Sequence, residues 1–537
     1  MIGIIVAGHG NFPTGIMSAV SLIAGNPEHI KAVDFVKGMS SQELKQKLEE
    51  QMEALGTSEI LVMTDLLGGT PFNVASGIKT ESEKSIKVLA GTNLAMAVEA
   101  IFCRELMGLE ELAEIIRQSA KDGVEDFDSL GNDDEMINIE EIKKREEFLY
   151  GKLLTRKEVE YALEEAKASV KRNMEYLNGK FPFSAAYNSE PFPSERDGMY
   201  PITENVEWTT GFWTGLIWLM YDWSREECFK ELGMADVRSF KERVEKRIDL
   251  NHHDLGFLYS PSCVAAYQLC QSEEGKQAAL QAADILMERY RENGHFIQAW
   301  GNVGDPKDYR LIIDCMLNIP LLYWKSRVTG DERYEKAARE HFITSCNNVV
   351  RDDASAYHTF YFDPETGEPV KGVTRQGYSD DSAWARGQAW GIYGIALNYR
   401  NSNIGEAFDL FKGMTNYFLN RLPQDNVCYW DLIFGDGSGQ SRDSSAAAVA
   451  VCGMQEMCKY LPETDEDKEV YKYAMHTILR SLIENYANHS HKPGEALLLH
   501  GVYSWHSGKG IDVGNIWGDY YYVEALVRFL KDWKVWW

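Results

Sequence analysis

The tryptophans of this chain are unevenly distributed, and their distribution divides the sequence in two. All 14 lie at or beyond Trp208, and only two of the 12 histidines, His9 and His29, precede residue 250. At 537 residues the chain is also too long for one ordinary domain. A charged stretch that contains glycine and asparagine lies between the halves and is typical of a linker. The sequence therefore predicts two domains, 1–130 and 151–537, joined by a linker over 131–150.

The composition excludes several kinds of partner and cofactor. A formal net charge of −27 disfavours nucleic acid and anionic membranes, so any anionic ligand must meet locally placed donors or cations. The nine cysteines are scattered, without a CxxC pair or a metal-ligand spacing. No apolar run approaches the about 18 residues of a membrane span, and the first residues lack the basic segment of a secretion signal. We therefore expect a cytoplasmic protein with reduced thiols, no metal and no cofactor.

Short apolar runs alternate with amphipathic segments in the first half. Strands are expected over 2–6, 30–35, 59–63 and 86–90, and helices over 14–24, 41–55, 71–78 and 95–106. Buried strands that alternate with helices predict an α/β fold with a doubly wound parallel sheet. Ligands of such folds bind at the carboxyl ends of the strands.

Two polar residues stand directly after predicted strands of this half. His9 follows the first strand, between two glycines that would let the backbone approach a phosphate, and Asp65 follows the third strand. Alone, His9 would be interpreted as a turn residue without chemistry. Its placement with Asp65, at two strand ends of one small domain, favours a functional site.

Three segments of this half carry a family resemblance: 7–10 (Ala-Gly-His-Gly), 34–36 (Asp-Phe-Val) and 65–73 (Asp-Leu-Leu-Gly-Gly-Thr-Pro-Phe-Asn). In these segments, residues 1–130 resemble the enzyme IIA domain of the mannose-type sugar phosphotransferase system.

The resemblance implies a phosphohistidine carrier. His9 would accept a phosphoryl group from the phosphocarrier protein and pass it to an enzyme IIB. Asp65 would orient the ring of His9, and Thr70 would place a hydroxyl near the phosphoryl group. Asn93 matches a recurrent loop of the family. Domains of this kind usually pair as dimers, which makes a homodimer through this half one possible state; the sequence itself does not give the oligomeric state.

The second half consists mainly of long amphipathic helices with few strand signals. Helical spacing of apolar residues occurs over 162–177, 211–223, 276–291, 407–422, 469–486 and 520–533. A region of this length holds about a dozen helices. The economical arrangement is an all-α toroid of inner and outer helices, the (α/α)6 barrel, with loops gathered at one end.

Two carboxylates of this half are candidates for catalysis. Asp314 stands in an apolar run, Ile312-Ile-Asp-Cys-Met316, where burial would raise its pKa toward the range that suits a general acid. Asp254 follows a pair of histidines 60 positions earlier. A lone buried aspartate is more often structural. The pair, in a chain rich in aromatic residues, indicates sugar chemistry.

Several indoles of this half could stack on a sugar ring. Trp208, Trp300 and Trp390 lie at helix starts or in loops flanked by glycine. For any one of them a place in the core is an equally good interpretation.

Many motifs of 140–537 resemble glycoside hydrolase family 88, the unsaturated glucuronyl hydrolases. They include 207–213 (Glu-Trp-Thr-Thr-Gly-Phe-Trp), 252–260 (His-His-Asp-Leu-Gly-Phe-Leu-Tyr-Ser), 312–315 (Ile-Ile-Asp-Cys) and 384–391 (Trp-Ala-Arg-Gly-Gln-Ala-Trp-Gly). The resemblance implies the (α/α)6 barrel and the release of Δ4,5-unsaturated uronic acid from oligosaccharides left by polysaccharide lyases.

The same resemblance implies roles for individual residues. Asp314 would protonate the double bond at C4 and activate the water that adds at C5, with Asp254 as its partner carboxylate. The sugar would pack on Trp208, Trp300 and Trp390. The uronate would be surrounded by His358, Gln376 and Arg386, with Arg386 as the clamp for its carboxylate.

A last motif bears on the substrate. Ser504, Ser507 and Lys509 form S-x-x-S-x-K, two hydroxyls and one cation within reach of an oxyanion. Alone it would be interpreted as a polar surface loop. Members of the family that prefer sulfated glycosaminoglycan disaccharides resemble this chain here. We therefore expect unsaturated chondroitin disaccharides with a 6-sulfate on N-acetylgalactosamine.

The position of the sulfate stays open at the level of sequence, and so do two further questions. The larger half could instead be an unsaturated rhamnogalacturonyl hydrolase, although S-x-x-S-x-K and His252-His-Asp254 disfavour it. The smaller half could relay phosphate for sugar uptake, regulate the hydrolase, or serve only for dimerisation.

Overall fold

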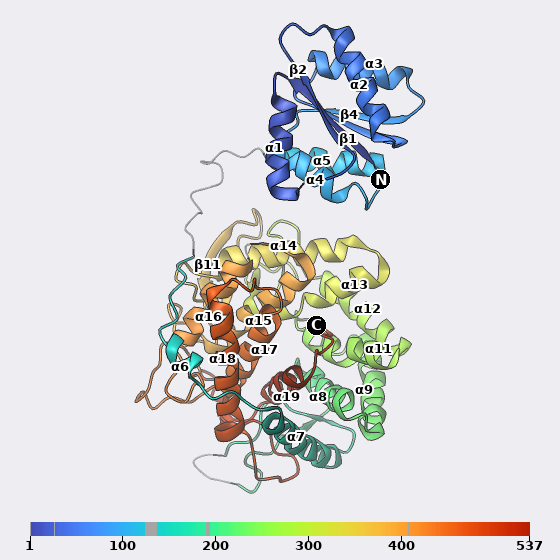
Figure 1. Ribbon diagram of the computed structural model, residues 1–537. Helices are drawn as coiled ribbons and strands as arrows, with labels where there is room; N and C mark the ends of the chain where they lie inside the picture. Colours follow the sequence, from blue (N-terminus) through green and yellow to red (C-terminus); the bar gives the residue numbers. More distant parts are fainter. Residues whose placement is uncertain (1, 26, 124–136, 190–193, 406) are drawn as a thin grey trace. The chain divides into compact units, whose positions relative to one another are not determined.

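The structure, a computed structural model, describes the chain except residues 1, 26, 124–136, 190–193 and 406 (Figure 1). It divides into two compact units, Met1–Asp134 and Glu135–Trp537. Each unit has hydrophobic cores of its own.

The smaller unit is built on a four-stranded parallel sheet in the order β2-β1-β3-β4. Its strands are β1 (Gly3–His9), β2 (Ile30–Phe35), β3 (Glu59–Thr64) and β4 (Ser85–Ala90). Its helices are α1 (Phe12–Ala24), α2 (Ser41–Leu55), α3 (Thr70–Glu81), α4 (Leu94–Cys103) and α5 (Leu109–Asp122). The α/β prediction is confirmed, whereas α5 was not among the expected helices.

Alternate residues of β1 face opposite sides of the sheet, and each side has its own helices. Ile4 and Val6 pack in a core with α1, α4 and α5. Ile5 and Ala7 pack in a second core with α2 and α3. Because both faces are covered, the central strand is buried along its length and only its last residue, His9, is exposed.

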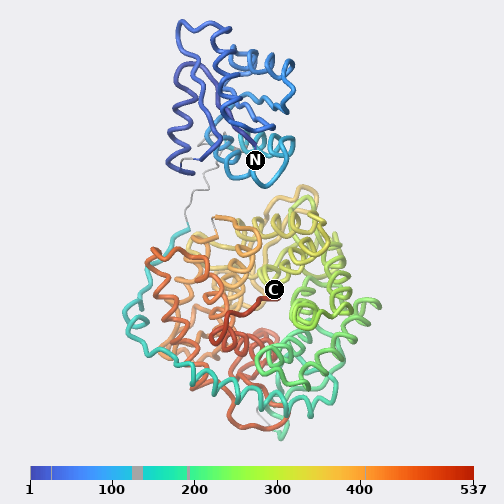
Figure 2. Tube along the Cα trace, turned by 45° about the vertical axis from the view of Figure 1, so that its right-hand side comes forward, coloured from blue at the N-terminus to red at the C-terminus, as the bar shows by residue number. Residues whose placement is uncertain are grey.

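The larger unit is a ring of paired helices (Figure 2). The inner helices are α8 (Thr210–Ser224), α10 (Leu255–Tyr259), α13 (Pro320–Thr329), α15 (Ala385–Ser402), α17 (Ser444–Met457) and α19 (Ile516–Leu530). The outer helices are α7 (Arg156–Leu177), α9 (Glu227–Glu245), α12 (Glu273–Met287), α14 (Glu332–Val349), α16 (Ala407–Asn420) and α18 (Glu466–Ser481). The last inner helix, α19, packs on α8 and closes the ring. This arrangement confirms the predicted (α/α)6 barrel.

Burial explains which helices are inner. The inner helices α15, α17 and α19 are buried on nearly every side along most of their length, whereas outer helices such as α14 and α18 bury one stripe only. A helix that is apolar all round must be enclosed by others, and an amphipathic one can face solvent.

Short elements connect the helices of the barrel. The strands are β5 (Phe181–Pro182), β6 (Ile202–Thr203), β7 (Tyr290–Arg291), β8 (Phe296–Ile297), β9 (Arg310–Ile312), β10 (Thr359–Phe362), β11 (Pro369–Val373), β12 (Gly501–Ser504) and β13 (Lys509–Val513). The remaining helices are α6 (Arg145–Leu149), η1 (Ser260–Val264), α11 (Ala265–Cys270), η2 (Ile313–Leu317) and η3 (Leu482–Tyr486). Strand β9 pairs with β10, and β12 with β13.

The segment 137–150, which the sequence analysis placed in the linker, lies on the barrel. Phe148 is fully buried in the core of the larger unit. The Asn138 amide donates to Asp352 O at 2.7 Å, and Glu140 pairs with Arg421 at 3.0 Å. These contacts extend the larger unit beyond its expected start at 151, while 131–136 lies outside the described residues. Within the described part of the chain, no helix is long and apolar enough to cross a membrane.

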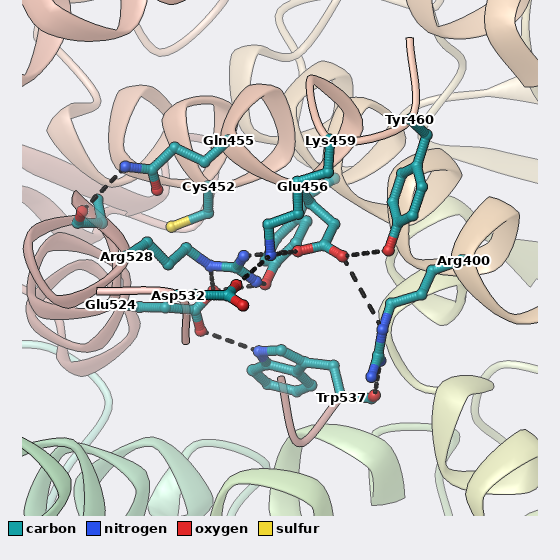
Figure 3. A network of polar contacts seen from close by, with 12 residues as sticks. Arg400, Cys452, Gln455, Glu456, Lys459, Tyr460, Glu524, Arg528, Asp532 and Trp537 are labelled. Carbon is teal, nitrogen blue, oxygen red and sulfur yellow. Dashed lines mark hydrogen bonds and ion pairs between the residues drawn. The ribbon is translucent and has the colours of Figure 1, made fainter. Parts of the chain in front are cut away.

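A buried ionic network links the inner helices α17 and α19 to the last residues (Figure 3). The Arg528 guanidinium donates to Glu456 Oε2 at 2.6 Å and to Glu524 Oε1 at 2.9 Å, and each side chain is at most 2% exposed. Trp537 Nε1 donates to Glu524 Oε2 at 2.9 Å. Burial alone would raise the pKa of Glu456, but the charges of Arg528 and neighbouring Lys459 lower it to about 2.

Replacing Arg528 with Met should destabilise the barrel strongly. The change leaves Glu456 and Glu524 buried without their cation, which costs about 3–5 kcal/mol. The free energy of unfolding can be measured in urea by tryptophan fluorescence, because every tryptophan lies in the larger unit. The control, Arg333→Met, breaks a pair between Asp331 and an arginine side chain that is 80% exposed, and it should change the free energy of unfolding little. Equal losses in the two variants would contradict a structural role for the network.

Candidate active sites

His9 and Asp65 meet at the carboxyl edge of the parallel sheet, because β1 and β3 are neighbours. The Asp65 Oδ2 atom lies 2.9 Å from His9 Nδ1 and accepts the His9 amide at 2.7 Å. A proton on Nδ1 leaves the lone pair on Nε2, for which the described residues provide no hydrogen-bond partner. The His9 side chain is 45% exposed, so Nε2 can act as a nucleophile toward a phosphoryl group from solvent.

The start of α3 lies directly against the His9 ring. A Cβ atom at Gly69, the residue before α3, would stand 2.9 Å from His9 Cε1. Thr70 is the first residue of this helix. The free backbone amides of a helix N-terminus stabilise an anion, so the ring is placed where a transferred phosphoryl group would be favoured. Asn93 has a structural part, since its Oδ1 accepts the Met96 amide at 3.0 Å and caps α4.

The larger unit has a cavity of about 660 Å³ at one end of the barrel. It is lined by Trp208, His253, Asp254, Trp300, Asp314, His358, Arg375, Gln376, Tyr503, Ser504, His506, Ser507 and Lys509. The volume lies in the range of sites for small ligands. Nine of the residues expected from the sequence are brought together here: Trp208, Asp254, Trp300, Asp314, His358, Gln376, Ser504, Ser507 and Lys509.

Short strands place Asp314 beside His358. Asp314 is the second residue of η2, which follows β9, and His358 directly precedes β10. Because β9 pairs with β10, the Ile313 amide donates to His358 O at 3.1 Å. Asp254 comes from a different part of the chain and directly precedes the inner helix α10.

The two carboxyl groups of the cavity have opposite pKa shifts. Burial, and then the negative charge of Asp254, raises the pKa of Asp314 to about 7. Its Oδ1 has no hydrogen-bond partner among the described residues. Burial would also raise the pKa of Asp254, but His253 and His252 outweigh it and lower the pKa. Near neutral pH the site therefore holds a protonated acid beside an ionised carboxylate, the division of labour that acid catalysis needs.

The buried histidines of the cavity are neutral near pH 7. Burial lowers the pKa of His253 to about 4 and that of His358 to about 3. His253 Nε2 lies 3.4 Å from Asp254 Oδ1, and His358 Nδ1 lies 2.7 Å from Thr359 Oγ1. These rings therefore act as hydrogen-bonding groups and not as cations.

Two residues expected to contact the sugar lie behind the wall of the cavity. Trp390 is fully buried and packs on Phe257 and Tyr521, as a core residue does. Arg386 is 1% exposed and pairs with Asp443 at 2.6 Å.

The terminal N–H groups of the Arg386 guanidinium donate to other residues of the protein and not into the cavity. They reach Tyr503 O at 2.8 Å and Gln376 Oε1 at 3.0 Å. Arg386 thus orients cavity residues and does not itself line the cavity. Its motif could not reveal this, because the partner Asp443 lies on a distant segment of the chain.

Four lining residues were not expected from the sequence: His253, Arg375, Tyr503 and His506. Each of them directly precedes an expected residue in the sequence, and this adjacency is the signal that could have identified them. The Arg375 guanidinium lies 5.3 Å from the centroid of the Trp300 ring. No carboxylate of the described residues pairs with it, so it is a cation free to meet an anionic ligand.

The β12–β13 hairpin supplies a second cationic corner. Ser504 ends β12 and pairs with Lys509, the first residue of β13, and Ser507 lies in the turn between them. The Lys509 Nζ atom lies 4.3 Å from the centroid of Tyr503 and 4.8 Å from that of Phe183. Burial lowers its pKa, and the described residues offer it no ion-pair partner. This corner suits an anionic group such as a sulfate.

Comparisons with known proteins identify a family for each unit. A family model described as Glycosyl Hydrolase Family 88 matches residues 187–531, and one described as PTS system fructose IIA component matches 3–117. An unsaturated chondroitin disaccharide hydrolase of Streptococcus pneumoniae is 59% identical over 401 residues, which cover 75% of this chain and 99% of that protein. The fructose-specific EIIA component of Bacillus subtilis is 33% identical over 113 residues, 21% of this chain and 77% of that protein.

Solved structures resemble the larger unit. The crystal structure of an unsaturated glucuronyl hydrolase from Streptococcus agalactiae has a TM-score of 0.73 and 58% identity, covering 75% of this chain and 99% of that one. A mutant unsaturated glucuronyl hydrolase from the same organism, complexed with dGlcA-GalNAc6S, has a TM-score of 0.67 and 55% identity at the same coverage. These findings confirm the family resemblance that the sequence carried in each half.

A reaction in which Asp314 donates a proton should slow as pH rises through about 7, the raised pKa of this carboxyl. The test is kcat/KM against pH with an unsaturated chondroitin disaccharide, the substrate in the name of the streptococcal relative. Asp236 is a matched control, because burial also raises its pKa to about 7, yet it bonds Thr214 and does not line the cavity. The Asp236→Asn variant should keep the decline of kcat/KM above a pH of about 7, which is the alkaline limb of the profile. Loss of the limb in that variant would refute its assignment to Asp314.

Proposed function

This chain belongs to glycosyl hydrolase family 88, and we propose that its larger unit hydrates the C4–C5 double bond of an unsaturated uronic acid on a glycosaminoglycan disaccharide. The observation that carries the proposal is the opposite shift of the Asp314 and Asp254 pKa values in one cavity. It provides a proton donor at neutral pH without requiring a charged histidine or a metal.

The reaction begins with transfer of the Asp314 proton to C4. The C5 atom becomes cationic, and the ionised Asp254 stabilises the positive charge nearby. The Asp314 carboxylate then removes a proton from water, whose oxygen bonds to C5, so Asp314 ends the step protonated. The resulting hemiketal opens at the C5–O5 bond to give a ketone at C5 and a hemiacetal at C1. This hemiacetal collapses to an aldehyde and releases the second sugar, whose oxygen takes the hemiacetal proton. A carbon–carbon double bond receives the proton, so the spacing of the carboxylates does not set the stereochemistry as it does in ordinary glycosidases.

We propose that the second sugar carries a 6-sulfate that binds Ser504, Ser507 and Lys509. The relative solved with dGlcA-GalNAc6S supports this, as does the ammonium of Lys509, for which the described residues offer no ion-pair partner. Arg375, also without an ion-pair partner among the described residues, offers a second cation for the uronate carboxylate. The two cations answer the long-range repulsion that a net charge of −27 exerts on an anionic disaccharide.

Lys509→Ala should lower kcat/KM on the 6-sulfated disaccharide by about 10- to 100-fold, as expected for loss of a hydrogen bond to a charged group worth about 1.5–3 kcal/mol. Activity on the unsulfated disaccharide should change little. Lys371→Ala, at an exposed position of β11, is the control and should behave as the parent protein. Equal losses of Lys509→Ala on both substrates would reject the sulfate role. A parent preference for an unsaturated rhamnogalacturonan disaccharide would reject the substrate class.

For the smaller unit, we propose that His9 relays a phosphoryl group from the phosphocarrier protein to an enzyme IIB during uptake of the disaccharide. The His9–Asp65 pair and the helix N-terminus at Gly69 support this role. Both partners of such a relay are cytoplasmic proteins, and the nine free thiols suit that compartment. Homodimerisation through this unit is part of the proposal. Two exposed apolar residues support it, Leu22 on α1 and Phe102 on α4. Helices α1 and α4 are neighbours that pack against each other.

His9→Ala should abolish phosphorylation of the chain by the phosphocarrier protein and impair disaccharide uptake. Gly69→Ala should slow phosphorylation by about tenfold or more, because its Cβ would displace the His9 ring and small misplacements of reacting groups are costly. Gly77→Ala, in open space on the same helix, is the control and should leave the rate unchanged. Phosphorylation is measured by transfer of labelled phosphate. Normal uptake by His9→Ala would refute the relay. A hydrolytic rate that changed on phosphorylation would favour a regulatory module instead.

A further inference from the structure

One buried amide side chain connects the two segments that carry Asp254 and Asp314. Asn318 is fully buried and follows η2 by one residue. Its Oδ1 accepts the Phe257 amide, in α10, at 2.7 Å. Its Nδ2 donates to Asp314 O at 3.2 Å. The Asn318 side chain thus joins the backbone of Asp314 to helix α10, which begins directly after Asp254.

The same two segments touch through a glycine. A Cβ atom at Gly256 would stand 2.3 Å from Asn318 Cα and 2.5 Å from Asn318 O. Such distances are shorter than any real contact, and backbone atoms cannot swing aside. Any larger residue at 256 must therefore push α10 away from η2, and Asp254 lies only two residues before it.

We propose that Asn318, seated on Gly256, is a positioning residue that sets the separation of Asp254 and Asp314 and thereby how readily Asp314 releases its proton. The inference rests on the proposed function of these two carboxylates. Asn318 itself is not among the residues that line the cavity.

The electrostatics of the cavity make this separation matter. The groups that face Asp314 are Asp254 before α10, Arg386 on α15, Tyr521 on α19, His358 before β10 and the adjacent Cys315. After burial, Asp254 is the largest influence that raises the Asp314 pKa, and Arg386 opposes it. Coulomb energy falls with distance, so moving Asp254 away lowers the Asp314 pKa.

The test compares pH profiles. In Asn318→Ala the alkaline limb of kcat/KM should move to lower pH by about half a unit or more, and kcat should fall about tenfold with little change in KM. Gly256→Ala should shift the limb in the same direction through the same contact. Asn318→Ser, a milder change whose hydroxyl is too short to make both hydrogen bonds, supplies the profile if the alanine variant does not fold.

Asn398→Ala is the matched control. Asn398 is also fully buried and binds the same η2 segment, donating to Met316 O at 2.9 Å, but within the described part of the chain it makes no hydrogen bond to α10. The Asn398→Ala variant should lower the melting temperature about as much as Asn318→Ala does, but it should leave the alkaline limb of the pH profile in place. An unmoved limb in the Asn318 and Gly256 variants, or an equal shift in Asn398→Ala, would overturn the inference. If Asp314→Asn and Asp254→Asn remained active, the proposed function itself would fail, which is a separate outcome.

Discussion

The burial of the Asp314 carboxyl beside a second carboxylate is the constraint on which the larger unit depends. Asp314 is only 9% exposed, and its Oδ1 has no hydrogen-bond partner among the described residues, so the ionised form is poorly stabilised. The group therefore keeps its proton to a pH near neutrality. A closed ring of nearly fully buried helices provides the enclosure, and the short strands β9 and β10 at its end place Asp314 beside His358. The architecture thus creates the acid, since an exposed aspartate would be ionised near pH 7.

Individual cations at the cavity offset the net negative charge of this protein for an anionic ligand. The net charge of −27 repels an anionic sugar at a distance, yet Arg375 and Lys509 reach the cavity and pair with no carboxylate of the described residues. Arg386, in contrast, is neutralised by Asp443 and supports the wall. A buried cation held by its own counter-ion is structural, whereas an unpaired cation at a cavity surface remains available to a ligand.

The two units bring their functional residues together in different ways. In the smaller unit, parallel pairing of β1 and β3 brings His9 and Asp65 to one edge of the sheet, and hydrogen bonding directs the free ring nitrogen outward. In the larger unit, residues from distant helices and hairpins converge on one cavity, and desolvation together with neighbouring charges sets their protonation. The first site is exposed, as transfer between proteins requires. The second lies in a cavity whose two carboxyl groups are largely buried, which suits acid catalysis on a sugar.

The sequence by itself determined the family of each unit, the alternation of strands and helices before residue 106, and nine residues of the cavity. These follow from periodicity, strand-end positions and contiguous motifs, which are local properties. Only the tertiary structure decided that Trp390 and Arg386 stand behind the cavity wall, that Arg375 and His253 line it, and that 137–150 packs on the barrel. Whether a side chain faces a cavity or a core depends on partners far away in the chain, such as Asp443 for Arg386. Burial and the pKa values it sets are therefore properties of the assembled barrel and not of any motif.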